Sequence, residues 1–214
     1  KWICIQERTG MRRNKMRVIG ITGGVGAGKS TVLDYVRQRR DTVVVQADLT
    51  GHEVMAPEGP CYEPILELFG PEILREDKSI DRGKVAAIVF QDGKKLAALN
   101  GIVHPAVKKE ILARIECARK EGVSLFFLEV ALLFEDHYDA ICDDLWYIYA
   151  DESVRRERLM DSRGYSQEKI NGIFANQMSD TFFRTHCDYV VENNGDLAVT
   201  YGQIEERIHS YETL

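Results

Sequence analysis

The most chemically specific stretch of the chain runs from Gly23 to Thr31 and reads GGVGAGKST. From Gly23 it has the spacing Gly-x-x-x-x-Gly-Lys-Ser, in which the backbone N–H groups of a glycine-rich turn surround a phosphate. In this pattern the lysine, Lys29, reaches the β- and γ-phosphates, and the hydroxyl of Ser30 is a ligand for Mg²⁺. The pattern therefore predicts a nucleoside triphosphate site. Its predicted residues are Gly24, Val25, Gly26, Ala27, Gly28, Lys29, Ser30 and Thr31.

A second candidate is Asp48, which follows the β-branched run 42–46. Open α/β sheets bind ligands at the carboxyl ends of their strands, and an aspartate there can orient an acceptor hydroxyl and take its proton. Asp48 is therefore a candidate catalytic and substrate-binding residue. Alternatively, it caps the helix that follows. Residues 48–51 also spell the Asp-x-x-Gly of GTPases, but they follow Ser30 too closely for a switch loop, and the sequence contains no Asn-Lys-x-Asp motif.

Two further acids follow apolar runs. Glu129 closes the run 125–128 and occupies the position of an acid that holds Mg²⁺ through water, so we count it among the candidate substrate-binding residues. The alternative is a buried acid with a partner. Glu135 follows a second apolar run and has the weaker case, since an acid at the end of a strand is commonly solvated.

The stretch 153–163 is rich in arginine, with Arg155 and Arg158 spaced to share one helical face. Such a helix can be a lid that brings guanidinium groups to the transferred phosphoryl group, or a solvated helix whose arginines pair with neighbouring acids. His104 precedes Pro105, which suits the first turn of a predicted helix over 105–121. We expect His104 to contact an acceptor substrate or, alternatively, to cap or pack at that helix start.

These residues must be positioned by an alternation of strands and helices. Short apolar runs without strict alternation predict strands at 17–22, 42–46, 123–129, 145–150 and 189–191, and helical stretches separate them. This pattern predicts an α/β fold of the doubly wound kind. The segment between the second and third strands is far longer than a crossover needs, so we expect an inserted helical subdomain there.

Composition narrows the class of protein. The chain has 214 residues, 44% of them hydrophobic, and a formal net charge of −6, which disfavours nucleic acid as a general partner. Its longest apolar runs are too short to cross a bilayer. Five scattered cysteines without Cys-x-x-Cys spacing favour reduced thiols and a cytoplasmic protein. We expect residues 1–15 to be an extension or an expression remnant outside the fold.

Several segments together resemble the dephospho-coenzyme A kinase family: IGITGGVGAGKS, QADLTGHEV, LNGIVHPAV, EVALLFE and CDYVVENNG. The resemblance runs from about Met16 to Leu214. It implies a kinase that uses ATP and Mg²⁺ to phosphorylate the ribose 3′-hydroxyl of dephospho-CoA, giving CoA and ADP. It also implies a P-loop kinase core with a five-stranded parallel sheet (about 16–48, 123–152 and 187–214), a helical CoA-binding insertion (about 49–122) and a helical lid (about 153–180).

Carried over residue by residue, the resemblance makes Asp48 the proposed base, Gly24 to Thr31 the ATP loop, and Arg158 and Arg163 the lid arginines. It places His104 in the substrate subdomain. Two positions depart from the family pattern: Gln46 stands where the first acid of Asp-Ala-Asp is usual, and Ala131 where proline is frequent. The alternatives are a P-loop kinase for a nucleoside, a nucleotide or a small alcohol, and a nucleotide-dependent switch or motor without an acceptor.

Overall fold

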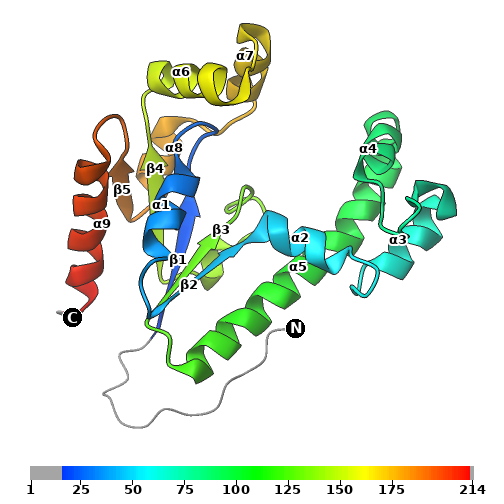
Figure 1. Cartoon of the computed structure of the whole chain (residues 1–214), viewed down its shortest axis with the longest axis horizontal. Coiled ribbons are helices and arrows are strands. Elements are labelled where there is room, and N and C mark those ends of the chain that lie inside the picture. The colour runs from blue at the N-terminus through cyan, green and yellow to red at the C-terminus, as the bar shows by residue number, and fades with distance from the viewer. Residues whose placement is uncertain (1–15, 213–214) are drawn as a thin grey trace. The chain divides into compact units, whose positions relative to one another are not determined.

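A five-stranded sheet forms the core of the computed structural model, which describes residues 16–212. The expected extension, residues 1–15, lies outside the described residues. The sheet order is β2-β3-β1-β4-β5, with β1 parallel to β3 and β4, and β4 parallel to β5. This confirms the predicted α/β fold (Figure 1). The strands are β1 (Arg17–Thr22), β2 (Thr42–Gln46), β3 (Leu125–Glu129), β4 (Asp144–Tyr149) and β5 (Tyr189–Glu192).

The two faces of the sheet are covered by different helices. On one face, Trp146 and Ile148 of β4 belong to a buried cluster that includes α1 (Lys29–Val36) and α9 (Leu197–Glu212). Successive side chains of a strand point to opposite faces. Tyr147 accordingly lies on the other face and stacks on Phe183 of α8 (Asp180–His186), with ring centroids 4.8 Å apart. The strand β1 pairs with β3 on one side and β4 on the other, and its Val18, Ile19 and Ile21 are fully buried in this two-sided core.

The segment between β4 and β5 is helical, and side chains define where each helix begins. It contains α6 (Glu152–Arg163), α7 (Gln167–Ala175) and α8. Ser166 accepts a hydrogen bond from the N–H of Lys169, and Ser179 accepts one from the N–H of Phe182, as N-cap residues do. Gly164, with φ 59°, ends α6 in the left-handed conformation.

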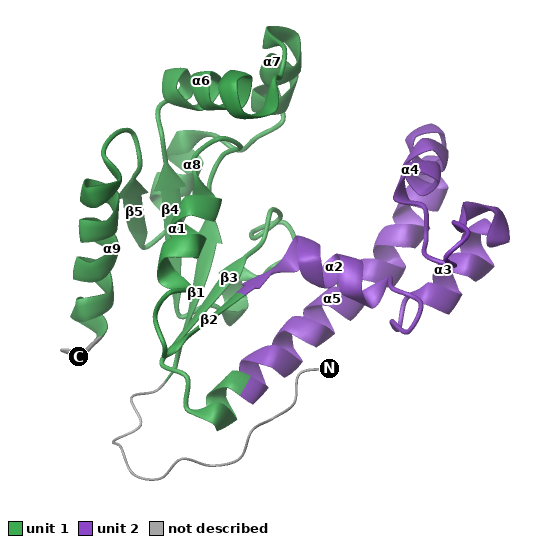
Figure 2. Cartoon of the chain, viewed as in Figure 1, with its two compact units in different colours: residues 1–44, 118–214 green, residues 45–117 purple. Residues whose placement is uncertain are grey.

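The chain divides into two compact units (Figure 2). One holds the described residues up to 44 and from 118 onwards, with the sheet core, α6 to α9 and the 3₁₀ turn Asp139–Ile141. The other, residues 45–117, is helical. Its elements are α2 (Ala47–Val54), α3 (Tyr62–Phe69), the 3₁₀ turn Pro71–Ile73, α4 (Arg82–Gln91) and most of α5 (Gly93–Glu121).

The helical unit has its own packing. Ile65, Phe69, Ile73 and Ile111 are almost fully buried, so α3, the 3₁₀ turn and α5 contribute to the unit's buried interior. Arg114 of α5 forms ion pairs with Glu53 of α2 and with Glu110 one turn away. This guanidinium fixes α2 against α5.

The start of α5 differs from the prediction. The helix begins at Gly93, so the prediction that Pro105 opens it is wrong. Asp92 explains the earlier start, because its carboxylate accepts hydrogen bonds from the N–H groups of Lys94 and Lys95 at 2.9 and 3.1 Å. Pro105 lies inside the helix, where its missing N–H removes one backbone hydrogen bond. His104 is therefore a half-buried residue of the helix interior and not an N-terminal one.

One buried ion pair attaches α9 to the sheet. Asp144, at the start of β4, is only 4% exposed and accepts hydrogen bonds from Arg207 at 2.8 Å and from the indole N–H of Trp146 at 2.9 Å. The hydroxyl of Tyr211 also donates to Asp144. A buried carboxylate needs such partners, because desolvation of an isolated charge is costly.

Candidate active site

The glycine-rich turn leaves β1 at Thr22 and enters α1 at Lys29. It is closed by a hydrogen bond of 3.1 Å from the N–H of Ala27 to the carbonyl of Gly24. The N-cap of α1 is Gly28, which has no capping side chain, and the first turn contains no acidic residue. The N-terminus of α1 therefore presents backbone N–H groups and a positive dipole end to an anion.

Lys29 lies across this turn. Its ammonium group donates hydrogen bonds to the carbonyls of Gly23 at 2.7 Å and of Gly24 at 3.4 Å. These contacts hold the charge at the mouth of the turn, where it can meet the phosphates. The predicted nucleotide loop thus forms the strand–turn–helix unit that its spacing requires.

The loop is held from the C-terminal side of the chain by Asn193. This residue is 1% exposed and follows β5 directly. Its side-chain amide donates to the carbonyl of Ala27 at 2.7 Å and accepts from the hydroxyl of Thr200 at 3.1 Å. A Cβ at Gly28, whose φ is +90°, would come within 2.2 Å of the Asn193 amide nitrogen. Only glycine fits there, on both backbone and steric grounds. Sequence reasoning missed Asn193.

Two arginines of α6 also contact the loop. Arg158 donates to the backbone carbonyl of Asn193 at 2.8 Å and to that of Ala27 at 3.5 Å. Arg155, one turn earlier, donates to the carbonyl of Val25 at 3.0 Å. These contacts are those of a helix packed on the loop, so the alternative of a fully solvated helix is wrong for these two residues.

Arg163 lies elsewhere. It is the last residue of α6 and is exposed, with its guanidinium 5.9 Å from the centre of the Tyr165 ring. No hydrogen bond or ion pair within residues 16–212 joins it to the loop, and its role as a lid arginine stays a prediction.

Oxygen groups that suit Mg²⁺ lie at the carboxyl edge of the sheet. Ser30 is exposed in the first turn of α1. Glu129 ends β3 and pairs in register with Ile21, next to the end of β1. Within residues 16–212 there is no cluster of three His, Cys, Asp or Glu side chains that could hold a metal ion. Ser30 and Glu129 offer oxygen ligands from only two side chains. Such a site suits a Mg²⁺ ion that is held largely by substrate phosphates and water.

Asp48 belongs to the helical unit. It is an exposed residue in the first turn of α2, two residues after the end of β2. The N-cap position is Gln46, so the alternative in which Asp48 caps the helix is wrong. The negative charge of its carboxylate interacts favourably with the positive end of the α2 dipole. The carboxylate is exposed to solvent and accessible to a substrate.

A cavity of about 360 Å³ adjoins the glycine-rich loop. Gly24 and Arg155 form part of its wall, and Tyr147, Tyr149 and Phe183 supply aromatic surface. Burial, reinforced by the nearby carboxylate of Asp180, raises the pKa of Tyr147. Its hydroxyl therefore stays protonated at neutral pH.

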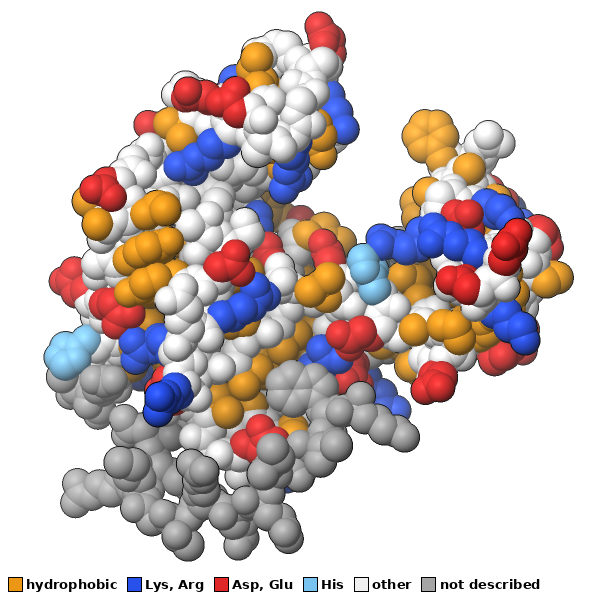
Figure 3. All heavy atoms as spheres, viewed as in Figure 1, with side chains coloured by type: hydrophobic (Ala, Val, Ile, Leu, Met, Phe, Trp, Pro, Cys, Tyr) orange, Lys and Arg blue, Asp and Glu red, His pale blue; other side chains and the backbone are white. Residues whose placement is uncertain are grey.

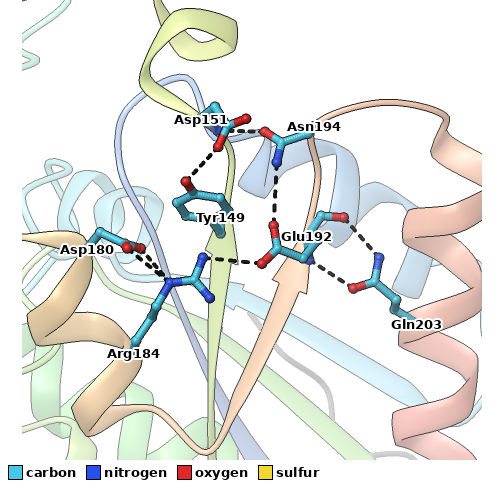
Figure 4. Close-up of polar contacts among 7 residues, drawn as sticks. All are labelled: Tyr149, Asp151, Asp180, Arg184, Glu192, Asn194 and Gln203. Atoms are coloured by element: carbon cyan, nitrogen blue, oxygen red, sulfur yellow. Dashed lines mark hydrogen bonds and ion pairs between the residues drawn. The ribbon is translucent and has the colours of Figure 1, made fainter.

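A polar network crosses the base of α6 beside this cavity (Figure 4). The Tyr149 hydroxyl donates to Asp151, the N-cap residue of α6, at 2.6 Å. Arg184 forms ion pairs with Asp180 at 3.0 Å and with Glu192 at 3.2 Å, and its guanidinium lies 4.3 Å above the Tyr149 ring. The start of α6, α8 and the end of β5 are thus connected. Sequence reasoning assigned Arg184 no function.

The surface carries charges of both signs. On the face shown in Figure 3, acidic and basic side chains are interspersed over both units. No helix in the described range is long and apolar enough to span a membrane. The expectation that nucleic acid is not a partner stays a prediction.

Comparisons with known proteins agree with one another. The model of the family described as "CoaE: Dephospho-CoA kinase" matches residues 17–198. A dephospho-CoA kinase of Symbiobacterium thermophilum is 37% identical over 190 residues, which cover 89% of this chain and 79% of the relative. A dephospho-CoA kinase of Corynebacterium diphtheriae is 38% identical over 180 residues, which cover 84% of this chain and 90% of the relative. The crystal structure of TT1252 from Thermus thermophilus superimposes with a TM-score of 0.76 at 29% identity, covering 91% and 97% of the two chains.

Proposed function

The chain belongs to the dephospho-CoA kinase family, and from this premise we propose which of its residues carry the reaction. The activity itself is dephospho-CoA kinase activity, a step of CoA biosynthesis, with ATP as the phosphoryl donor. The observation that supports our assignment most directly is the glycine-rich loop with Lys29 across its mouth and Arg155 and Arg158 packed on its outer side.

We assign ATP to residues Gly24 to Thr31. The backbone N–H groups of the loop and of the first turn of α1 bind the phosphates, and Lys29 contributes its charge to the β- and γ-phosphates. Arg158 acts on the same phosphates from α6, and Arg163 is proposed to approach them when α6 and α7 close as a lid.

For Mg²⁺, we propose that Ser30 is a direct ligand and that Glu129 acts through water. When bound, the ion neutralises charge on the phosphates and stabilises the charge of the transition state. The chain supplies oxygen ligands only, and the phosphates and water complete the shell.

We assign the acceptor to the helical unit, residues 45–117, which corresponds to the expected CoA-binding insertion at 49–122. Asp48 orients the ribose 3′-hydroxyl of dephospho-CoA and accepts its proton, and His104 binds the same substrate. We also propose a cytoplasmic location, which rests on the scattered cysteines. Fractionation of the producing cells, with detection of the protein in the membrane fraction as the contrary result, tests that location.

The test of the function is ADP release measured with dephospho-CoA, with a panel of nucleosides and nucleotides, and with no acceptor. We expect release only with dephospho-CoA, and CoA as the second product. Release of similar rate with a nucleoside would indicate a different small-molecule kinase, and slow release without any acceptor would indicate a switch or motor. Lys29→Ala should abolish transfer while the protein stays folded.

The proposed base is tested by Asp48→Asn. Because Asp48 is exposed and does not cap α2, this change should leave folding and the binding of both substrates intact. Single-turnover CoA formation should fall by about 10²- to 10⁴-fold, the usual contribution of a positioned acid or base. The lower end is expected, since a loose transition state demands less of a base. Activity within a few-fold of wild type would place the base elsewhere, with Glu129 the next residue to change.

A further inference from the structure

The guanidinium group of Arg155 packs directly against the backbone of the glycine-rich loop. This group lies flat against Gly24: a Cβ on that glycine would come within 2.5 Å of the guanidinium carbon. One nitrogen donates to the carbonyl of Val25 at 3.0 Å, and another donates to the side-chain oxygen of Gln177 at 2.6 Å. The guanidinium carbon also lies 4.1 Å from the centre of the Phe174 ring. The missing side chain of Gly24 is what admits this group to the phosphate loop.

The charge of Arg155 has no ion-pair partner of its own within residues 16–212, although the Glu152 carboxylate lies near enough to favour it. The third guanidinium nitrogen of Arg155, Nη1, has no acceptor among the same residues. The next residue on the helix behaves differently, since Arg156 forms an ion pair with Glu152 at 2.7 Å. Both arginines lie over the same Phe174 ring, but of the two only Arg155 contacts the glycine-rich loop and only Arg156 has an ion pair among the described residues.

The other charged side chains in the wall of the cavity already form ion pairs. The cavity is lined by Arg155 and by two carboxylates, Glu152 and Asp180. Glu152 is paired with Arg156, and Asp180 shares Arg184 with Glu192 (Figure 4 shows the contacts of Arg184). Arg155 is therefore the charged side chain of the wall that has no ion pair within the part of the chain that the structure describes.

A positive charge without an ion-pair partner favours the binding of an anionic ligand. Burial lowers the pKa of Arg155, which shows that the protein surroundings disfavour its charge, yet an arginine stays protonated at any physiological pH. A half-buried cation without a counter-ion costs free energy, and a phosphate oxygen beside it recovers that cost through a charge-assisted hydrogen bond. The adjoining glycine-rich loop has backbone N–H groups that bind phosphate.

We propose that Arg155 binds a phosphate oxyanion of the bound substrates through the edge of its guanidinium that faces no protein acceptor, from within the cavity beside Gly24. This rests on the proposed function, because that function supplies the phosphates. Two sources share the chemistry: the triphosphate of ATP, and the diphosphate of the acceptor dephospho-CoA. Gln177 and Phe174 are positioning residues, since they hold the guanidinium in place.

The experiment compares Arg155→Gln with Arg156→Gln. The glutamine amide at 155 can still donate toward the Val25 carbonyl, so this variant removes the charge with little loss of packing. The control removes an equal charge one residue away, from an arginine that faces Glu152. Binding of inorganic tripolyphosphate is measured by calorimetry, and kcat and KM are measured for ATP and for dephospho-CoA.

We expect Arg155→Gln to lose about 10- to 100-fold in at least one of these quantities, as removal of a hydrogen bond to a charged group does, and Arg156→Gln to stay within about two-fold of wild type. Weaker tripolyphosphate binding and a raised KM for ATP identify the donor triphosphate. A raised KM for dephospho-CoA alone identifies the acceptor diphosphate. A lowered kcat with unchanged KM identifies the phosphoryl group in transfer.

Equal behaviour of the two variants in all four quantities would overturn the proposal and leave Arg155 as a structural contact of α6. If thermal melting shows that Arg155→Gln does not fold, Gln177→Leu replaces it: this change keeps the charge but removes its anchor, and a substrate effect equal to that of Arg156→Gln would overturn the proposal in the same way. Failure of the proposed function is a separate result, because wild-type protein would then form no CoA, whereas tripolyphosphate binding would still report on Arg155.

Discussion

Replacement of Asn193 by alanine should weaken both the fold and the nucleotide loop. The side chain makes two hydrogen bonds in a site that is 1% exposed: its nitrogen donates to the carbonyl of Ala27 at 2.7 Å, and its oxygen accepts from Thr200 at 3.1 Å. Each such bond contributes about 1 kcal/mol net. The Ala27 carbonyl would keep only the contact of 3.5 Å from Arg158, and an under-satisfied buried acceptor adds about 1–3 kcal/mol. The expected loss in free energy of unfolding is about 3–5 kcal/mol.

This loss can be measured by urea unfolding and by calorimetry. For a chain of this length, about 1 kcal/mol shifts the melting temperature by about 2–4 °C, so Asn193→Ala should melt about 6–20 °C below wild type. Thr200→Val is the graded comparison, because it removes the donor to the Asn193 oxygen and leaves the bond to Ala27 intact. We expect it to lose about 1 kcal/mol.

The same variant tests whether Asn193 shapes the loop. With the carbonyl of Ala27 released, the turn at Gly28 is less well defined in the free protein, and ATP must order it on binding. We expect an ATP dissociation constant raised about 10-fold, or about 1.4 kcal/mol, for Asn193→Ala and an unchanged constant for Thr200→Val. A melting temperature within about 2 °C of wild type, together with unchanged ATP affinity, would refute the reasoning.

Three further changes probe other parts of the molecule. Asp144→Ala should cost about 3–5 kcal/mol in unfolding free energy, because it strands the charge of Arg207; a loss below about 1 kcal/mol in urea unfolding would contradict the buried ion pair. Burial raises the pKa of the Cys142 and Cys187 thiols from 9.0 to about 12. The contribution of the buried, protonated thiols to the free energy of unfolding is therefore full below pH 9 and is lost as the pH rises toward 12. Iodoacetamide should label these thiols slowly in native protein at pH 8 but rapidly in urea. Arg163→Ala should lower kcat more than it changes KM if this arginine reaches the transition state, whereas kinetics equal to wild type would make it a solvated helix end.

The strands and the nucleotide loop could be predicted because their signals are local. The run 42–46 became β2 with those bounds, and glycine spacing alone defined the turn before Lys29. The start of α5 was missed for a local reason as well: Asp92 is a good N-cap residue, but Pro105 offered a second plausible helix start. A proline inside a long helix is costly, so its position favoured the wrong boundary.

The partners of the loop could not be predicted in the same way. Arg155 and Arg158 were placed on one helical face, but which of them meets the loop, and through which atoms, depends on how α6 packs against residues 130 positions earlier in the chain. Asn193 belongs to the segment CDYVVENNG, whose resemblance gave it no role of its own. Its contact with Ala27 spans 166 residues, and no local pattern encodes such a distance.

The position of β1 has a consequence for the order of synthesis. This strand is made before β2 to β5, yet it pairs with β3 and β4, and its loop is completed by Asn193 after β5. Contacts between residues so distant in sequence form late and slow folding. A nascent chain whose Asn193 has not yet emerged from the ribosome therefore carries a glycine-rich segment without its final support. ATP should protect the chain from proteolysis only after β5 and α9 have emerged. Stalled chains of increasing length, treated with protease with and without ATP, would locate that point.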